Sequence, residues 1–184
     1  MQYQKLKKCI DSGRLQLSFG ESIQHYLIVI AAGGFSILGI YLVFSAKDEG
    51  RYERSVMILI ISCLIGILFF FIQYRRLRFV MIETELSQDE VAEVIDKVAI
   101  TSNWKQTSRS KNYYTASTPA SFLTGSWGEQ ITILLNDKRV YINSICDLKK
   151  QASVTAWGRN RKNVITFKRE LNLVETAKTT AKHP

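Results

Sequence analysis

Two long apolar stretches dominate the pattern of hydrophobic and polar positions along this chain. No residue carries a fixed charge over 22–46 or over 55–74. A helix needs roughly 20 apolar residues to cross the hydrocarbon core of a bilayer. The pattern therefore predicts two transmembrane helices, over 23–44 and 55–73, joined by a short turn outside the bilayer.

The polar part that follows begins with a helix signal. Ser87 is placed to cap a helix while the Glu90 carboxylate reaches back to the cap. Apolar residues then recur at helical spacing, at Val91, Val94, Ile95 and Val98. We therefore expect an amphipathic helix over 88–100.

Strand patterns surround this helix. The segment 78–85 alternates enough for a strand, although it could also continue the second span. Strands are expected at 113–118, 130–135 and 139–145, the last two as a hairpin, and a closing helix at 160–174. The order (β)αβββα predicts a small α+β domain, with one antiparallel sheet and helices on one face.

The expected organisation is a membrane α-hairpin that carries this domain. We predict an N-terminal tail (1–22), the hairpin (23–74), the α+β domain (75–174) and a disordered tail (175–184). Four cations precede the first span and three follow the second, against three in the turn. Because cations accumulate on the cytoplasmic side of membrane spans, both termini and the domain are expected in the cytoplasm.

Small residues predict how the two spans pack. Membrane helices approach each other closely through small side chains, here Ala32, Ser36 and Gly39 in the first span and Ser62 and Gly66 in the second. We expect these patches to face each other, with binding of another subunit as the alternative. Neither span contains Asp, Glu, Lys or Arg, which argues against a transporter or channel acting alone.

Composition narrows the classes of partner. The segment 75–184 holds 18 Lys and Arg against 11 Asp and Glu, a net charge of +7. Beside a membrane this favours anionic lipid or plain solvation over nucleic acid. The cysteines Cys9, Cys63 and Cys146 share no metal-ligand spacing, and only two histidines are present. No nucleic acid, metal or cofactor is therefore expected, and the absence of a disulfide framework fits a reducing compartment.

The most distinctive chemistry lies at the start of the closing helix. Cations at a helix N-terminus oppose the helix dipole, so Arg159, Arg161 and Lys162 suggest an anion site there, together with Asn160. Phosphate, a lipid headgroup or an acidic partner would fit it. The plainer interpretation is that Gly158 makes the turn, Asn160 caps the helix and the cations are solvated. The aromatic residues that could join this site are Trp157, Trp127 and Phe122.

No catalytic residues are predicted. Cys146 beside Asp147 lacks the histidine that a nucleophilic cysteine uses as its base. The segment 124–128 looks like a nucleophile elbow but lacks its first glycine. An enzyme would have to use Asp147 or Glu129 as acid or base, with the basic segment holding phosphate.

Two segments resemble uncharacterised small bacterial two-span membrane proteins. Their last strand reads Val-x-Ile/Val-Asn-Ser-x-Cys-Asp, here 140–147, and their final helix opens with Gly-x-Asn-x-x-Asn-Ile/Val-x-x-Phe, here 158–167. Trp157 stands where those proteins often have Phe. The resemblance implies a bacterial origin and a shared soluble domain. Together with the two predicted spans, this origin leads us to expect the protein in the bacterial inner membrane.

The functional prediction is a non-enzymatic, membrane-anchored accessory or scaffold protein. Its basic cytoplasmic domain would engage a protein partner in a membrane complex, or anionic membrane lipid. The alternative is an enzyme that acts on a phosphorylated or lipid-linked substrate at the membrane surface. A third interpretation is an immunity-type or assembly protein whose hairpin is itself the working surface.

Overall fold

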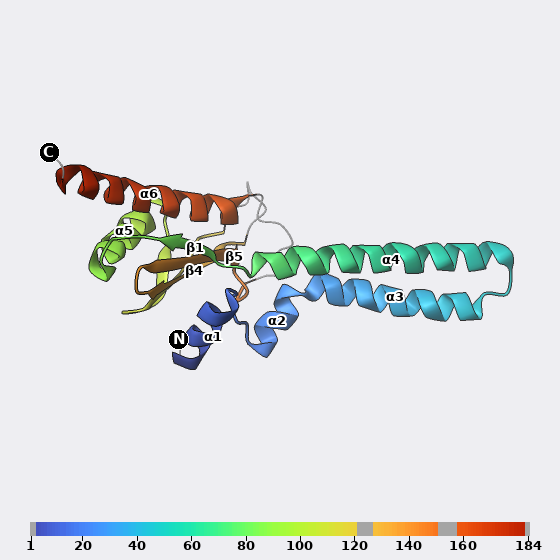
Figure 1. Ribbon diagram of the computed structural model, residues 1–184. Helices are drawn as coiled ribbons and strands as arrows, with labels where there is room; N and C mark the ends of the chain where they lie inside the picture. Colours follow the sequence, from blue (N-terminus) through green and yellow to red (C-terminus); the bar gives the residue numbers. More distant parts are fainter. Residues whose placement is uncertain (1–2, 121–126, 151–157, 183–184) are drawn as a thin grey trace. The chain divides into compact units, whose positions relative to one another are not determined.

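The structure, a computed structural model, describes residues 3–120, 127–150 and 158–182 (Figure 1). Within these residues the chain forms six helices and five strands. They divide into two compact units: Leu17–Arg76 forms one, and Met1–Gln16 joins Leu77–Pro184 in the other. Each unit is described in turn.

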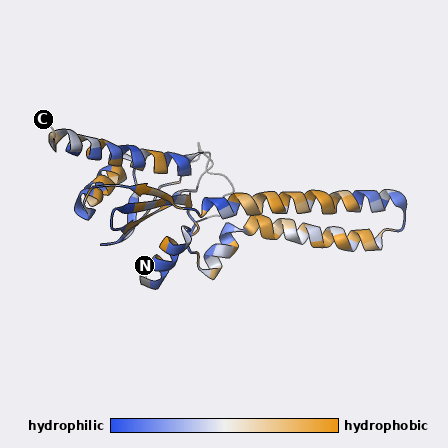
Figure 2. Ribbon diagram, viewed as in Figure 1, coloured by the Kyte–Doolittle hydropathy of each residue, from blue (hydrophilic) through white to orange (hydrophobic). Residues whose placement is uncertain are grey.

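The helical unit contains α2 (Phe19–His25), α3 (Leu27–Ser45) and α4 (Glu49–Arg76). The helices α3 and α4 are long and apolar enough to cross a membrane (Figure 2). Most of the large apolar side chains exposed in the described residues lie on these two helices. The chain therefore contains the two apolar helices that the sequence predicts.

Both helices have boundaries that differ from the predicted ones. The segment before α3 forms the separate helix α2, which a capping box of Ser18 and Glu21 starts. The second apolar helix begins at Glu49 rather than near residue 55, because the polar residues before the apolar stretch are also helical. The Asp48 carboxylate accepts a hydrogen bond from the Arg51 N–H at 2.8 Å and supports this early start. Only residues 46–48 connect the two helices.

The second unit is built on a five-stranded antiparallel sheet of order β1-β5-β4-β3-β2. Its strands are β1 (Val80–Glu83), β2 (Lys105–Ser110), β3 (Tyr113–Ser117), β4 (Glu129–Asn136) and β5 (Arg139–Cys146). The predicted hairpin is confirmed: Asn136 pairs with Arg139 across a turn in which Asp137 has a φ of 50°. After α4 the order is βαββββα, with one strand more than the sequence predicts.

Two helices cover one face of this sheet. They are α5 (Gln88–Thr101) and α6 (Arg159–Lys182). Their apolar stripes meet the inward side chains of the strands in the main core, where Val98, Ile133 and Phe167 are all fully buried. The predicted start of α5 is confirmed, since Glu90 N–H donates to Ser87 Oγ at 3.3 Å and Glu90 Oε2 accepts from Ser87 N–H at 2.6 Å.

A third helix corrects the prediction that helices lie on one face only. The N-terminal residues form α1 (Tyr3–Ser12) instead of a tail, and Leu6 and Cys9 pack with Leu134 and Tyr141 in a second core cluster. These strand residues alternate with those that face α5 and α6, so α1 covers the opposite face. Lysines separate the apolar positions of α1, so the sequence shows no clear apolar pattern for this helix.

Two further differences concern β2 and the C-terminus. The edge strand β2 is exposed along its length and carries no apolar alternation, so its sequence resembles a loop. Helix α6 continues to Lys182, where a tail was predicted from residue 175. Contacts of Glu175 and Lys178 with the rest of the domain hold this extension in place.

Candidate functional site

A buried ion pair fixes the start of α6. Gly158, with a φ of 80°, makes the turn, and Arg159 Nη2 lies 3.3 Å from Glu129 Oε2. Glu129, the first residue of β4, is fully buried, and the Thr118 hydroxyl donates a hydrogen bond to the same carboxylate oxygen. Of the residues predicted to bind an anion, Arg159 therefore has its charge offset within the domain.

The asparagines at the start of α6 also make internal contacts. Asn160 Oδ1 accepts a hydrogen bond from Ser144 Oγ at 3.2 Å. Asn163 Nδ2 donates to the same hydroxyl at 3.0 Å, and Asn163 Oδ1 accepts from Trp104 Nε1 at 3.4 Å. This network ties α6 to β5 and to the residues that follow α5. Asn160 therefore helps to position the start of α6.

The structure leaves two of the predicted cations on the surface. Arg161 and Lys162 are exposed in the first turn of α6. Trp127 is 51% exposed just before β4. Trp157 and Phe122 lie outside the described residues, so the predicted aromatic patch stays a prediction.

Further along α6, both carboxylates point toward the rest of the domain. Glu170 Oε2 lies 3.0 Å from Lys97 Nζ of α5, and Glu175 Oε1 accepts a hydrogen bond from Glu85 N–H at 2.6 Å. In the same region Lys178 Nζ lies 2.6 Å from Glu90 Oε1, and this ammonium, with the capping contacts of Ser87, lowers the pKa of Glu90 to about 2. The acidic side chains of α6 are thus used within the domain.

The opposite side of α6 combines exposed cations with exposed apolar side chains. Ile165 is 52% exposed and Leu173 is 55% exposed, and they line a shallow groove of about 610 Å³ with Lys168 and Arg169. We call this side the outer face of α6. Its residues are Arg161, Lys162, Ile165, Lys168, Arg169 and Leu173.

The outer face was missed at the sequence level, although a signal for it is present. The inward positions of the helix account for Phe167 and Leu171, which are fully buried. Ile165 and Leu173 are eight residues apart and fall on the other side of the helix. Once the buried positions of the helix are assigned, Ile165 and Leu173 remain as apolar residues outside the core, and they could have indicated this surface.

The carboxylates considered for catalysis also have internal partners. Asp147 Oδ2 lies 3.6 Å from Lys150 Nζ, and Asp147 Oδ1 accepts a hydrogen bond from Lys149 N–H at 3.1 Å. Glu129 is held by Thr118 and Arg159. In the described part of the chain, no group of three or more His, Cys, Asp or Glu could hold a metal ion. These contacts give both carboxylates a role in the fold.

In the helical unit, the small residues predicted to pack the spans lie where α3 contacts α4. Ser36 Oγ and Ser62 Oγ are 3.0 Å apart. A Cβ on Gly39 would lie 3.0 Å from Leu59 Cα, and a Cβ on Gly66 would lie 3.4 Å from Ala32 Cβ. The two glycines therefore allow a close approach of the helices.

No protein-family model, curated protein or solved structure matches the chain.

Proposed function

We propose that this protein is a non-enzymatic accessory or scaffold subunit of a bacterial inner-membrane complex. In this proposal α3 and α4 anchor it in the membrane, both termini lie in the cytoplasm, and the outer face of α6 binds an acidic surface of a protein partner. The observation that carries the proposal is the distribution of charge on α6. Its carboxylates contact the rest of the domain, and although Arg169 also lies 3.1 Å from Glu170, the outer cations Arg161, Lys162 and Lys168 are exposed.

The side chains of α3 and α4 support the membrane anchor. Large apolar side chains such as Phe35, Ile61 and Leu68 are exposed on both helices. Soluble proteins rarely expose continuous apolar surfaces of this kind, whereas a bilayer solvates them. The anchor would hold the basic domain close to other membrane proteins.

The composition of the outer face supports a protein partner. Binding surfaces between proteins commonly have an apolar centre that excludes water and a polar or charged rim. Ile165 and Leu173 would form such a centre, and Arg161 and Lys168 part of such a rim. The complementary surface is acidic at its edge and apolar in the middle.

Anionic lipid is the weaker candidate for this surface. Helices that lie in a membrane interface bury a broad apolar face among the headgroups. The broad apolar face of α6 is already used by the core, through residues such as Phe167 and Leu171. The outer face offers two large apolar side chains, separated along the helix by Arg169 and other polar residues.

The test is a double charge reversal, Arg161→Glu with Lys168→Glu, in the full-length protein. We expect recovery of the co-purifying partner from native membranes to fall about tenfold, which corresponds to about 1.4 kcal/mol. Arg159 is left unchanged because its reversal would place a second carboxylate beside buried Glu129.

The matched control is Lys105→Glu with Lys149→Glu, which makes the same charge change at exposed positions outside α6. It should retain the partner. Equal recovery with both double variants would contradict the proposal. Retention of anionic lipid alone, lost only with the α6 variant, would assign the surface to lipid instead.

A further inference from the structure

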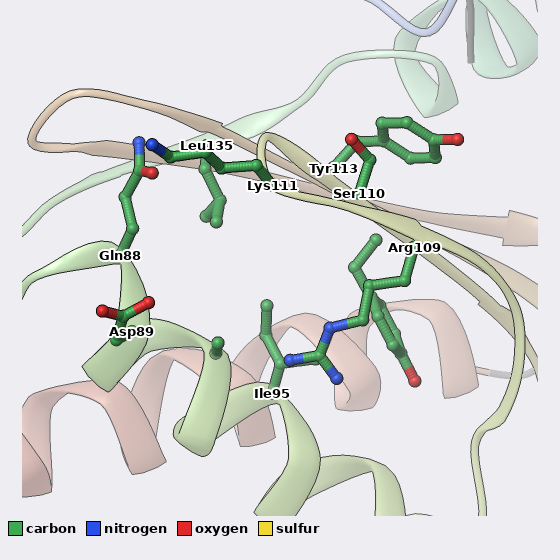
Figure 3. A pocket seen from close by; sticks show the side chains of 10 residues that line it. Gln88, Asp89, Ile95, Arg109, Ser110, Lys111, Tyr113 and Leu135 are labelled. Atoms are coloured by element: carbon green, nitrogen blue, oxygen red, sulfur yellow. The ribbon is translucent and has the colours of Figure 1, made fainter.

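A separate pocket lies in the domain, on the side of the sheet that α5 covers. It is formed between the first two turns of α5 and the turn end of the β2–β3 hairpin, and its volume is about 250 Å³ (Figure 3). Sites for drug-sized ligands usually measure about 300–1,000 Å³, so this pocket has room for a small molecule only. The proposed partner surface on α6 does not use it.

The inner wall of the pocket is apolar and rigid. Ile95 and Tyr114 are each 2% exposed, and Leu135 is 7% exposed. Ile95 and Tyr114 belong to the main core, which fixes their side chains before any ligand arrives. This wall favours a compact apolar body.

A guanidinium group is held in place at one end of the pocket. Arg109 Nη1 lies 2.5 Å from Asp96 Oδ1, and the Arg109 Cζ lies 5.8 Å from the centre of the Tyr114 ring. This ion pair is formed by Nη1 of the planar group. Since a guanidinium has five N–H donors in a rigid fork, donors remain for a carboxylate in the pocket.

The rest of the rim sets the charge that a ligand can carry. Lys111 extends toward Gln88 across the mouth, while the carboxylate of Asp89 lies at the end opposite Arg109 (Figure 3). The lining thus contains two cations and one carboxylate. Asp96 already offsets the charge of Arg109, so a ligand carboxylate is favoured there by the remaining N–H donors of Arg109 and by the charge of Lys111, while a second carboxylate near Asp89 would be repelled.

We propose that this pocket binds a small organic monocarboxylate with a compact apolar body. Its carboxylate accepts hydrogen bonds from Arg109, and its apolar part lies against Ile95, Tyr114 and Leu135. Lys111 covers the mouth and adds a second positive charge. Asp89 excludes ligands that carry a second carboxylate at the far end.

The test compares ligands that share a skeleton and differ in charge. One series shares a phenyl ring and consists of benzoate, benzamide and benzylamine. The other shares a four-carbon chain and consists of butyrate and succinate. Each compound is titrated into the detergent-solubilised full chain, and its binding is followed by saturation-transfer NMR of the ligand. We expect benzoate or butyrate to bind at least tenfold more tightly than benzamide, benzylamine and succinate. Equal binding of benzoate and benzamide, or no binding of either acid at 10 mM (about −2.7 kcal/mol), would overturn the proposal.

Substitutions then locate the site. Lys111→Gln should weaken benzoate about threefold, and Arg109→Gln should weaken it more than tenfold. Lys105→Gln removes an exposed cation of the same strand as Arg109 but outside the pocket, and it should have no effect. Asp89→Asn provides a readout that loss of folding cannot mimic, because it should allow succinate to bind. Unchanged benzoate affinity in Arg109→Gln, or continued exclusion of succinate by Asp89→Asn, would place binding elsewhere.

Discussion

At the scale of single residues, the buried Glu129 illustrates how charge is used in this domain. A buried carboxylate is costly unless it is paired and hydrogen-bonded. Arg159 and the Thr118 hydroxyl supply those contacts, so one polar cluster joins β4, the residues after β3 and the start of α6. The position of Arg161 and Lys162 on the surface follows from this cluster, because it sets how α6 begins.

Replacing this carboxylate should weaken the fold. We expect Glu129→Gln to lower the free energy of unfolding by about 1–3 kcal/mol, since Arg159 loses its charged partner but keeps some contact with water. Buried Trp104 can report urea unfolding of the full chain in detergent by its fluorescence. The control Glu83→Gln removes an exposed ion pair with Arg139 and should change stability by less than about 1 kcal/mol. Equal effects of both substitutions would show that the buried ion pair contributes no more to the free energy of unfolding than the exposed one.

The lowered pKa of Glu90 predicts that the docking of α6 on α5 depends on pH. Lys178 and the Ser87 contacts lower its pKa from the ordinary value of 4.5 to about 2 in the folded chain. Between pH 4.5 and 2 Glu90 binds more protons in the unfolded chain than in the folded chain. The stabilisation that the Glu90 carboxylate gives the fold is therefore complete above about pH 4.5 and is lost as the pH falls toward 2. The protection of amide hydrogens around Lys178 from exchange, relative to the intrinsic exchange rate at each pH, should therefore fall over this range. Glu90→Gln should remove that part of the pH dependence, and an unchanged profile in this variant would contradict the assignment.

At the scale of elements, the α3–α4 pair depends on one glycine more than on its neighbours. A side chain at Gly39 would press on the backbone of Leu59, whereas a Cβ on Gly34 would meet no atom within 4 Å. Gly39→Val should therefore destabilise the helix pair by about 1–3 kcal/mol through overpacking. Gly34→Val is the matched control and should be tolerated. The midpoint of unfolding with increasing SDS in mixed micelles measures both, and similar midpoints would contradict the helix contact described.

The elements that the sequence predicts well are those whose own residues carry a strong periodic pattern. Helix α5 has both a capping box and an apolar stripe, and β4 with β5 alternates over a short turn. Strand β2 lacks such a pattern because it is an edge strand with two solvated sides. Helix α1 is short and lysine-rich, so its stripe becomes evident only once a sheet face is present to cover.

The contacts around the start of α6 could not be predicted from the sequence. The cations at the start of α6 were identified, yet the partner of Arg159 is Glu129, thirty residues earlier in the chain. Such long-range pairing leaves no mark in the local pattern. The outer face of α6 consists of residues that the core does not bury. It can therefore be predicted only when the buried residues of the helix are known.

At the scale of the whole molecule, the distribution of cations predicts an orientation. The flanks of the two apolar helices carry more Lys and Arg than the connection between them, so both termini should lie in the cytoplasm. Reporter fusions that fluoresce in the cytoplasm but not in the periplasm should be active at either end of the chain. A fusion inserted at 46–48 should be inactive, and activity there would reverse the proposed orientation.

Site-specific photo-crosslinking in native membranes tests most directly whether the outer face of α6 binds a protein partner. A photoreactive amino acid is placed at Ile165 or Leu173 on the outer face of α6, or at Ile100, which is 81% exposed on α5, as the control. We predict one discrete protein adduct from both α6 positions, absent from the control and lost with Arg161→Glu and Lys168→Glu. No adduct from either α6 position, or the same adducts from all three, would contradict a partner-binding role for this surface.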